Sequence, residues 1–275
     1  MFPGATADRE AASYVVVGAP LDATTTFQPG TRFGPDRIRR FSETFDDYDR
    51  RTDSRFSALG VHDAGDVAPW DDVESYLDHL AGELRAAVID DAVPLALGGE
   101  HTVTHAGVDA VEPDALVVLD AHLDLRDAYD GNPLNHACVT RRALDDLGVD
   151  RVTVVGARTG SPEEWDRADE PDVEVVAPDD ARAWVDGLGP DAFAGESVYL
   201  SVDIDGADPG FAPGTGTMEP FGLSPREMRD AVRAVAPAAA GFDVVEVNDR
   251  DDGQAAALGG KLLREFVHAH AAADR

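Results

Sequence analysis

Short apolar runs alternate with amphipathic segments along most of this sequence, and this alternation is the feature that most restricts the fold. The run Ala115–Leu119 carries no polar side chain and is rich in branched residues, which is typical of a strand covered on both faces. Residues 71–90 instead place apolar side chains at helical spacing. Strands that alternate with helices through short loops predict a parallel sheet with helices on both faces.

The expected elements follow from this reading. We expect strands at 14–18, 60–66, 93–97, 115–119, 151–156, 173–176, 197–201 and 241–246. We expect a helix beginning near residue 35 and further helices at 71–90, 102–110, 136–147, 162–168, 178–187, 224–235 and 255–270. The loop at 19–34 is long for a compact α/β domain, which often marks a functional segment.

The composition predicts a single acidic domain over residues 1–275. A chain of 275 residues with 43% hydrophobic residues can bury a large core, and no linker or repeat divides it. Its 23 basic and 54 acidic side chains give a net charge of −31, which argues against nucleic acid as a partner.

The charge balance also predicts a halophilic protein. Lys261 is the only lysine, and so acidic a chain suits multimolar salt, which screens its self-repulsion. We therefore expect unfolding on dialysis into low salt. A melting temperature that does not change with salt concentration would contradict this expectation.

Cysteine content and the N-terminus predict a cytoplasmic protein. Cys138 is the only cysteine, so the chain forms no intrachain disulfide and offers no cysteine-based zinc site. The first ten residues lack the basic start and apolar core of a signal peptide. No apolar run approaches the roughly 18 residues that a membrane span needs, so we expect no membrane partner.

Polar side chains gather where the expected strands end. In an open parallel sheet the chemistry collects at the carboxyl ends of the strands. If the strand geometry continues past Leu119, residues at alternate positions point the same way, and Asp203 and Asp205 repeat this spacing. A polar strand end that arose by chance is the alternative for the first cluster alone. The candidates are His101, Asp120, His122, Asp124, Asp203, Asp205 and, after the last strand, Glu246.

Four carboxylates and two imidazoles in one place predict a dinuclear metal site. The negative charges would repel each other unless cations neutralise them, and two divalent ions do so in number. Oxygen-rich ligation with some imidazole favours Mn²⁺ over Zn²⁺. Two such ions share a water, lower its pKa and present hydroxide near neutral pH, so the predicted chemistry is hydrolysis.

Three motifs resemble the signatures of the ureohydrolases, the arginase and agmatinase family. They read Gly-Gly-Glu-His-Thr at 98–102, Leu-Asp-Ala-His-Leu-Asp at 119–124 and Ser-Val-Asp-Ile-Asp-Gly-Ala-Asp-Pro-Gly-Phe-Ala-Pro-Gly-Thr at 201–215. Residues 28–35 are similar to an agmatinase N-terminal loop, and 241–248 also match the family. The resemblance covers most of the chain.

The resemblance implies a three-layer α/β/α fold with an eight-stranded parallel sheet, two Mn²⁺ ions and hydrolysis of a guanidino group to an amine and urea. It implies that Asp120 and Asp203 bridge the ions. The first ion would be held by His101, Asp120, Asp124 and Asp203, and the second by Asp120, His122, Asp203 and Asp205.

The resemblance also implies residue roles around the metals. His136 would carry a proton to the leaving amine, and Glu246 would hold the substrate guanidinium. Glu219 and Asn135 are further substrate-binding candidates, although a surface carboxylate is the plain reading of Glu219. The family usually forms trimers or hexamers, so a homo-oligomer is expected. Asp249, Met218 and Phe221 depart from the family pattern and put the shape of the substrate mouth in doubt.

The expected substrate is agmatine, which would give putrescine and urea. The loop between Asp124 and His136 carries Asp127 and Asp130, which would repel the carboxylate of arginine. Arg126 could instead receive a carboxylate, which would favour guanidinobutyrate or another acidic guanidino compound. An arginase or formiminoglutamase activity, a zinc deacetylase of related fold and a catalytically silent metal-binding relative acting as an interaction module stay as alternatives.

Overall fold

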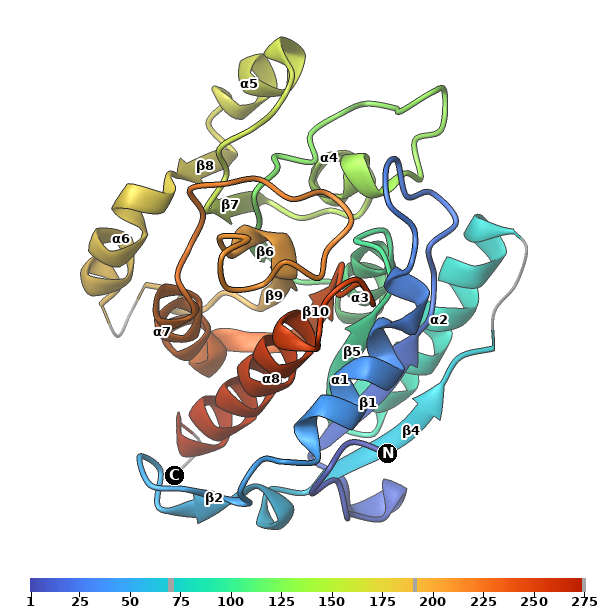
Figure 1. Ribbon diagram of the computed structural model, residues 1–275, viewed down its shortest axis with the longest axis vertical. Helices are drawn as coiled ribbons and strands as arrows, with labels where there is room; N and C mark the ends of the chain where they lie inside the picture. Colours follow the sequence, from blue (N-terminus) through green and yellow to red (C-terminus); the bar gives the residue numbers. More distant parts are fainter. Residues whose placement is uncertain (69–71, 190–191, 274–275) are drawn as a thin grey trace.

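A parallel sheet of eight strands forms the centre of the computed structural model, which describes residues 1–68, 72–189 and 192–273 (Figure 1). The strand order is β4-β1-β5-β10-β9-β6-β7-β8, and every pairing within this sheet is parallel. The predicted α/β fold with an eight-stranded sheet is therefore confirmed. The strands are β1 (Tyr14–Ala19), β4 (Val61–Asp66), β5 (Val93–Gly98), β6 (Ala115–Leu119), β7 (Arg151–Val155), β8 (Val173–Val176), β9 (Val198–Asp203) and β10 (Ala239–Val245).

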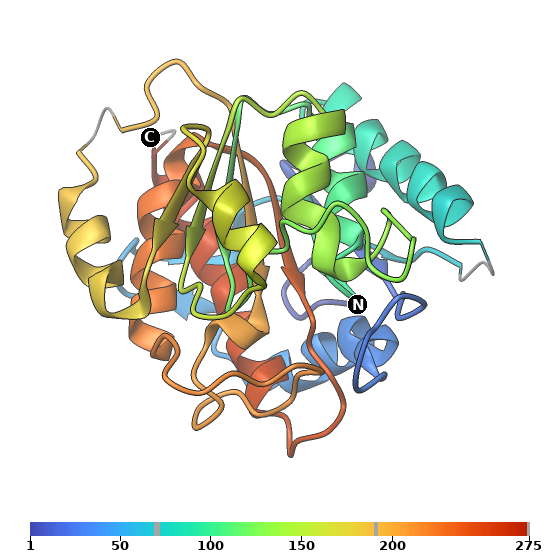
Figure 2. The same ribbon diagram turned by 90° about the horizontal axis from the view of Figure 1, so that it is seen from above.

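Helices cover both faces of the sheet, as Figures 1 and 2 show. Helices α1 (Gly34–Ser42), α7 (Pro225–Val235) and α8 (Gln254–Ala273) pack together on one face. Helices α2 (Val73–Ile89), α3 (Val103–Val111) and α4 (Val139–Asp146) lie on the other. Helix α5 (Pro162–Ala168) contacts β8, and α6 (Ala181–Gly187) contacts α7.

The apolar strands alternate between these two layers. In β1, Val16 packs in the core beneath α1 and α8, while Val15 and Val17 pack beneath α2 and α3. In β6, Val117 and Val118 likewise belong to opposite layers. Because central strands such as β1 and β6 are buried on both faces, they need apolar residues at nearly every position, which is why uninterrupted apolar runs identified them correctly.

The structure adds elements that hydrophobic patterning did not predict. A short antiparallel hairpin joins β2 (Tyr48–Asp49) to β3 (Ser54–Arg55). Two expected helices begin as 3₁₀ turns: η4 (His136–Cys138) precedes α4, and η5 (Pro178–Asp180) precedes α6. Helix α2 starts at Val73, with the Asp72 side chain accepting from the Ser75 amide, while residue 71 lies outside the described residues. The remaining 3₁₀ turns are η1 (Arg9–Ala11), η2 (Thr31–Phe33), η3 (Phe56–Ala58), η6 (Ile204–Gly206) and η7 (Ala236–Ala238).

In the described part of the chain, no helix combines the length and apolarity that crossing a bilayer requires. The prediction of one domain over residues 1–275 stays a prediction.

A buried ion pair joins α1 to β4. Arg39 is 8% exposed, and its guanidinium donates two hydrogen bonds of 2.8 Å to the Asp63 carboxylate and also contacts Asp66. We expect Arg39→Met to lower the free energy of unfolding by about 3–5 kcal/mol, because it leaves a buried carboxylate without its cation. Denaturant unfolding measures this loss. Arg40→Met, at the exposed next position, is the matched control, and a loss under about 1 kcal/mol for Arg39→Met would contradict the prediction.

Candidate metal centre

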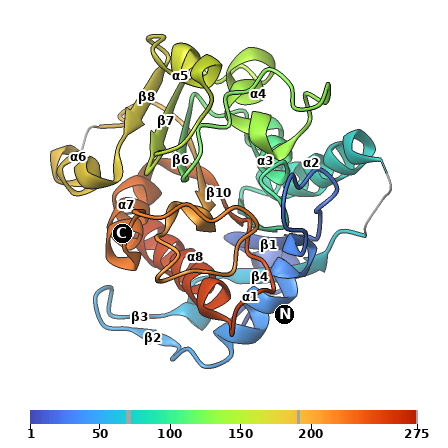
Figure 3. The same cartoon turned by 45° about the horizontal axis from the view of Figure 1, so that its top comes forward.

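Four neighbouring strands bring the candidate residues to one end of the sheet. Strands β5, β10, β9 and β6 lie side by side, and parallel pairing puts all their carboxyl ends at the same edge. Figure 3 shows the loops that follow β1, β6 and β9 gathered at this end. His101 comes shortly after β5, Asp120 directly after β6 and Glu246 directly after β10, while Asp203 is the last residue of β9.

The backbone that brings these residues together is not extended throughout, whereas the period-two spacing predicted that it would be. Strand β6 ends at Leu119, and Asp124 has a φ of 50°, in the left-handed region. Asp205 lies in the 3₁₀ turn η6 rather than on an extension of β9. The extended geometry was therefore wrong beyond Leu119 and Asp203. Glu246 also has a positive φ, of 60°, and such strained backbone is concentrated at functional sites.

Two groups of side chains could each hold a metal ion. The first is His101, Asp120 and Asp124, and the second is Asp120, His122 and Asp205. His101 Nδ1 lies 2.8 Å from Asp124 Oδ2 and 3.2 Å from Asp120 Oδ2. His122 Nδ1 lies 3.1 Å from Asp205 Oδ2 and 3.4 Å from Asp120 Oδ1. Asp120 thus belongs to both groups.

Asp203, the other predicted bridging ligand, lies beside the first group. Its Oδ2 is 3.5 Å from His101 Nδ1, while its Oδ1 accepts from the Asp205 amide at 2.8 Å. A side-chain Cβ at Gly206 would meet the Asp120 amide nitrogen at 2.9 Å, so glycine lets η6 pack directly against the end of β6. This close packing brings the two aspartate motifs together.

The electrostatics of the cluster suit divalent cations. Burial, with Asp205 and Asp120 nearby, raises the pKa of Asp203 well above its ordinary value. Burial and Asp120 raise the pKa of Asp124 to about 6. Asp120 Oδ2 is buried without a hydrogen-bond partner in the described chain. Carboxylates crowded in this way are costly unless cations neutralise them, and their oxygens with imidazole nitrogens form a donor set that fits Mn²⁺.

A buried polar network behind His101 was not anticipated. His101 Nε2 lies 3.2 Å from Ser201 Oγ, and that hydroxyl donates to Asp243 Oδ1 at 2.6 Å. Thr104 Oγ1 donates to Asp243 Oδ2 at 2.8 Å. The network holds the ring with Nδ1 turned toward Asp120 and Asp124, because a hydrogen bond to one ring nitrogen fixes the orientation of the other. A carboxylate inside the otherwise apolar strand β10 was the sequence signal that could have revealed it.

His136 and Glu246 form a buried pair beside the cluster. His136 Nδ1 donates to Glu246 Oε1 at 3.0 Å. Burial opposes charge on the ring, but the bond to Glu246 prevails and raises the pKa of His136 to about 9. Glu246 Oε2 is buried and has no hydrogen-bond partner among the described residues. The pair therefore offers a titratable imidazole and a free carboxylate oxygen.

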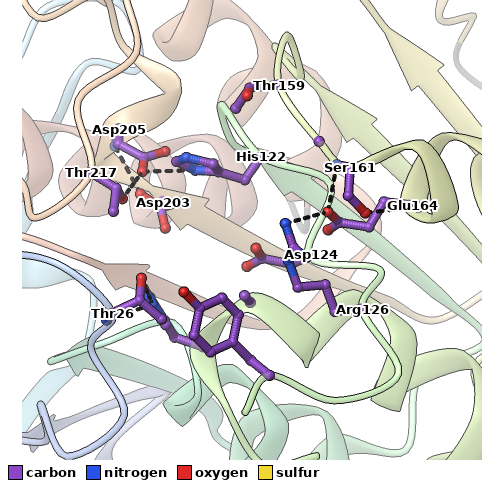
Figure 4. A pocket seen from close by; sticks show the side chains of 14 residues that line it. Thr26, His122, Asp124, Arg126, Thr159, Ser161, Glu164, Asp203, Asp205 and Thr217 are labelled. Atoms are coloured by element: carbon purple, nitrogen blue, oxygen red, sulfur yellow. Dashed lines mark hydrogen bonds and ion pairs between the residues drawn. The ribbon is translucent and has the colours of Figure 1, made fainter.

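A cavity of about 280 Å³ opens above these groups. Figure 4 shows His122, Asp205 and Thr217 in one part of its wall and Arg126, Glu164 and Ser161 in another. Of the predicted site residues, His122, Asp124, Asp203, Asp205 and His136 line it. The full lining is Thr26, His122, Asp124, Arg126, Tyr129, His136, Ala137, Thr159, Gly160, Ser161, Glu164, Asp203, Asp205 and Thr217.

Glu246, Asn135 and Glu219 are not among the residues that line this cavity. Glu246 contacts the lining residue His136. Asn135 Nδ2 donates to the Thr24 carbonyl at 2.9 Å, and Asn135 Oδ1 accepts from the Ala137 amide at 3.0 Å, so this side chain supports the loop structure. Their predicted contacts with substrate stay predictions.

The wall of the mouth differs from the expected one. Asp127 and Asp130 do not line the cavity, and the Asp127 side chain is 83% exposed and pairs with Arg142. Besides the motif aspartates, the wall contains the carboxylate of Glu164, which sequence reasoning missed; its Oε2 lies 3.1 Å from Arg126 Nη2. Arg126 is thus already paired.

The fold and the cluster together define a class: an α/β protein with a cluster of carboxylates and imidazoles that could hold metal ions at the carboxyl edge of its sheet. In the comparison with protein-family models, residues 12–269 match the model described as the arginase family, which is nearly the whole chain. The chain belongs to this family of ureohydrolases. The predicted resemblance is therefore confirmed.

Relatives and solved structures agree with this assignment. The chain is 38% identical to an agmatinase of Pyrococcus horikoshii over 94% of its length and 92% of the relative's. It is 39% identical to an N(1)-aminopropylagmatine ureohydrolase of Thermococcus kodakarensis, with coverages of 92% and 89%. The crystal structure of an agmatine ureohydrolase of Thermoplasma volcanium matches with a TM-score of 0.90 at 36% identity, covering 98% of this chain and 93% of that one.

Proposed function

We propose that this protein is a dinuclear manganese hydrolase that converts agmatine and water to putrescine and urea. One observation carries the proposal. Two candidate metal-binding groups that share Asp120 lie beside the same cavity as the buried pair of His136 and Glu246. Several similar proteins of known name are agmatinases.

The proposed ligands are those implied by the motifs. Asp120 and Asp203 would be shared by the two ions. One Mn²⁺ would also be held by His101 and Asp124, and the other Mn²⁺ would also be held by His122 and Asp205. When bound, the ions act as Lewis acids that lower the pKa of a water molecule and so supply a nucleophile near neutral pH. Loss of two ions per chain on treatment with a chelator should lower the melting temperature, since the ions bind the folded state.

The remaining steps belong to the protein's own side chains. Glu246 Oε2, the oxygen without a partner in the described chain, is available to accept from the substrate guanidinium. His136 sits at the cavity wall with its Nδ1 on Glu246, so it can carry a proton to the leaving amine. These roles require substrate to reach past the cavity wall to Glu246.

The substrate prediction now rests on Glu164 and Arg126. Glu164 and Arg126 form an ion pair in the wall, so Arg126 is not free to receive a carboxylate. We expect kcat/KM for agmatine to exceed that for arginine and guanidinobutyrate. We expect Arg126→Ala to keep this order, because Glu164 then lacks its cation.

The test is urea release by the Mn²⁺-loaded protein in high salt. The panel contains agmatine, aminopropylagmatine, arginine, guanidinobutyrate, guanidinopropionate and formiminoglutamate. A preference for a compound that bears a carboxylate would overturn the agmatine assignment, and absence of urea from every compound would overturn the enzyme. A cytoplasmic homo-oligomer stays the prediction for the assembled protein.

A further inference from the structure

A short threonine segment, residues 24–26, lies directly against His136. It belongs to the long loop between β1 and α1. The Thr26 amide donates to His136 Nε2 at 3.1 Å, and Thr26 Oγ1 lies 2.9 Å from the same nitrogen. The His136 amide in turn donates to Thr24 Oγ1 at 3.0 Å. The segment therefore contacts both the backbone and the ring of His136.

The carboxylate of Glu100 anchors this segment. Glu100 has no exposed surface. Its Oε2 accepts from the Thr24 amide at 2.7 Å, its Oε1 accepts from Thr24 Oγ1 at 2.7 Å, and Thr25 and Thr102 donate to it at 3.2 and 3.1 Å. A buried carboxylate that accepts so many bonds makes a rigid attachment, because leaving it unpaired would be costly.

The backbone reinforces the attachment. The Gly99 and Glu100 amides donate to the Ala19 and Leu21 carbonyls, each at 2.7 Å. A Cβ at Gly99 would overlap the Leu21 backbone, so glycine is needed for the loop to lie this close. The loop is thus tied to the end of β5, next to the first metal-binding group.

These contacts determine which nitrogen of His136 carries a proton. Nε2 accepts from the Thr26 amide and Nδ1 donates to Glu246, so these two contacts favour the tautomer with its proton on Nδ1. The charged groups around the ring, Glu246, Asp124 and Glu100, all favour the imidazolium. The Thr26 amide is the group that opposes protonation of Nε2.

We propose that Glu100 is a positioning residue for His136: it holds the threonine segment against the ring, so that the Thr26 amide faces Nε2 and opposes its protonation. This inference rests on the proposed role of His136 as proton carrier. Glu100 does not line the cavity, and it holds the segment through its hydrogen bonds from Thr24 and Thr25.

The first test needs no activity. In the Mn²⁺-loaded protein, Thr24→Val removes the hydroxyl that joins Glu100 to the His136 amide while nearly keeping its volume. Hydrogen exchange should rise at least about tenfold at residues 24–26 and also at residue 136, because opening the segment exposes both sets of amides. Glu100→Gln should give the same pattern.

Asp22→Asn is the matched control in the same loop. Asp22 accepts from the Gly30 amide and from Arg32, and within the described chain it forms no hydrogen bond with Glu100 or His136. Exchange at residue 136 should not change in this variant. An equal rise there for Asp22→Asn, or no rise for Thr24→Val and Glu100→Gln, would overturn the inference.

The second test separates positioning from general loosening. One limb of the pH profile of kcat/KM should disappear in His136→Asn, and the position of that limb in the wild-type protein reports the pKa of the His136 ring. In Thr24→Val this limb should move to higher pH by about one unit, because the donor opposing protonation is lost while the charges of Glu246, Asp124 and Glu100 remain. kcat should fall about tenfold with two ions still bound per chain. An unmoved limb would overturn the inference.

The two proposals fail differently. If the wild-type protein releases no urea, the proposed function fails, and the exchange experiment still decides whether Glu100 holds the segment on His136. If Glu100→Gln does not fold, Thr24→Val carries both tests, since it keeps the buried charge and leaves Thr25 and Thr102 to pair with it.

Discussion

Replacing Asp120 with alanine is expected to remove both metal ions and to lower kcat/KM for urea release by roughly 10³-fold or more. Asp120 belongs to both metal-binding groups, with Oδ2 facing His101 and Oδ1 facing His122. A single substitution therefore takes a ligand from each ion, and metal ions supply several kcal/mol of transition-state stabilisation in hydrolases. Metal analysis after desalting, together with the urea assay, measures the effect.

Asp205→Ala provides the contrast, because Asp205 belongs only to the group with His122. We expect it to weaken one ion and leave the other. Asp203→Ala tests the second proposed bridging ligand in the same way. Asp127→Ala, on an 83% exposed side chain, is the control for a change of charge nearby. If Asp120→Ala and Asp205→Ala lose the same single ion, Asp120 does not bridge.

His136→Ala is expected to lower kcat by about 10²–10⁴-fold while two ions stay bound. General acid catalysis by a placed side chain contributes about this factor, and His136 is the imidazole in the cavity wall that is hydrogen-bonded to Glu246. Its companion, Glu246→Gln, should cost roughly 1.5–3 kcal/mol in kcat/KM through loss of a charge-assisted bond to the guanidinium.

The control for this pair is the substitution His62→Ala. The Nδ1 of His62 contacts the Ala7 carbonyl, and His62 does not line the cavity. It should keep wild-type kcat. Near wild-type activity in both His136→Ala and Glu246→Gln would remove these residues from the mechanism. A fall in activity that tracks loss of metal would instead assign them a structural role.

Local sequence determined the elements and the chemistry-bearing residues. Strands buried on both faces must be apolar throughout, so Ala115–Leu119 is recognisable without its neighbours. Caps are equally local: Ser224 and Glu227 form a capping box at the start of α7. The motif residues His101, Asp120 and Asp203 could be named because their types and the strands before them suffice to place them at strand ends.

The tertiary structure decided how these pieces meet. The order β5-β10-β9-β6 does not follow the chain, and it depends on which helices and strands pack best together rather than on any one segment. That packing holds Asp124 in a left-handed conformation and Asp205 in a 3₁₀ turn, where local spacing predicted extended strands. Strain of this kind persists only when the surrounding structure outweighs it.

Side-chain partners far apart in sequence were likewise invisible before folding. Glu164 pairs with Arg126 in the cavity wall, and Glu100 reaches Thr24 across the loop after β1. The sequence by itself determined the parallel α/β class, the arginase-family motifs and the candidate ligands, because these depend on residue type and short-range periodicity. Only the tertiary structure decided the charge of the mouth and the setting of His136, because each depends on contacts between segments that approach only when the core is assembled.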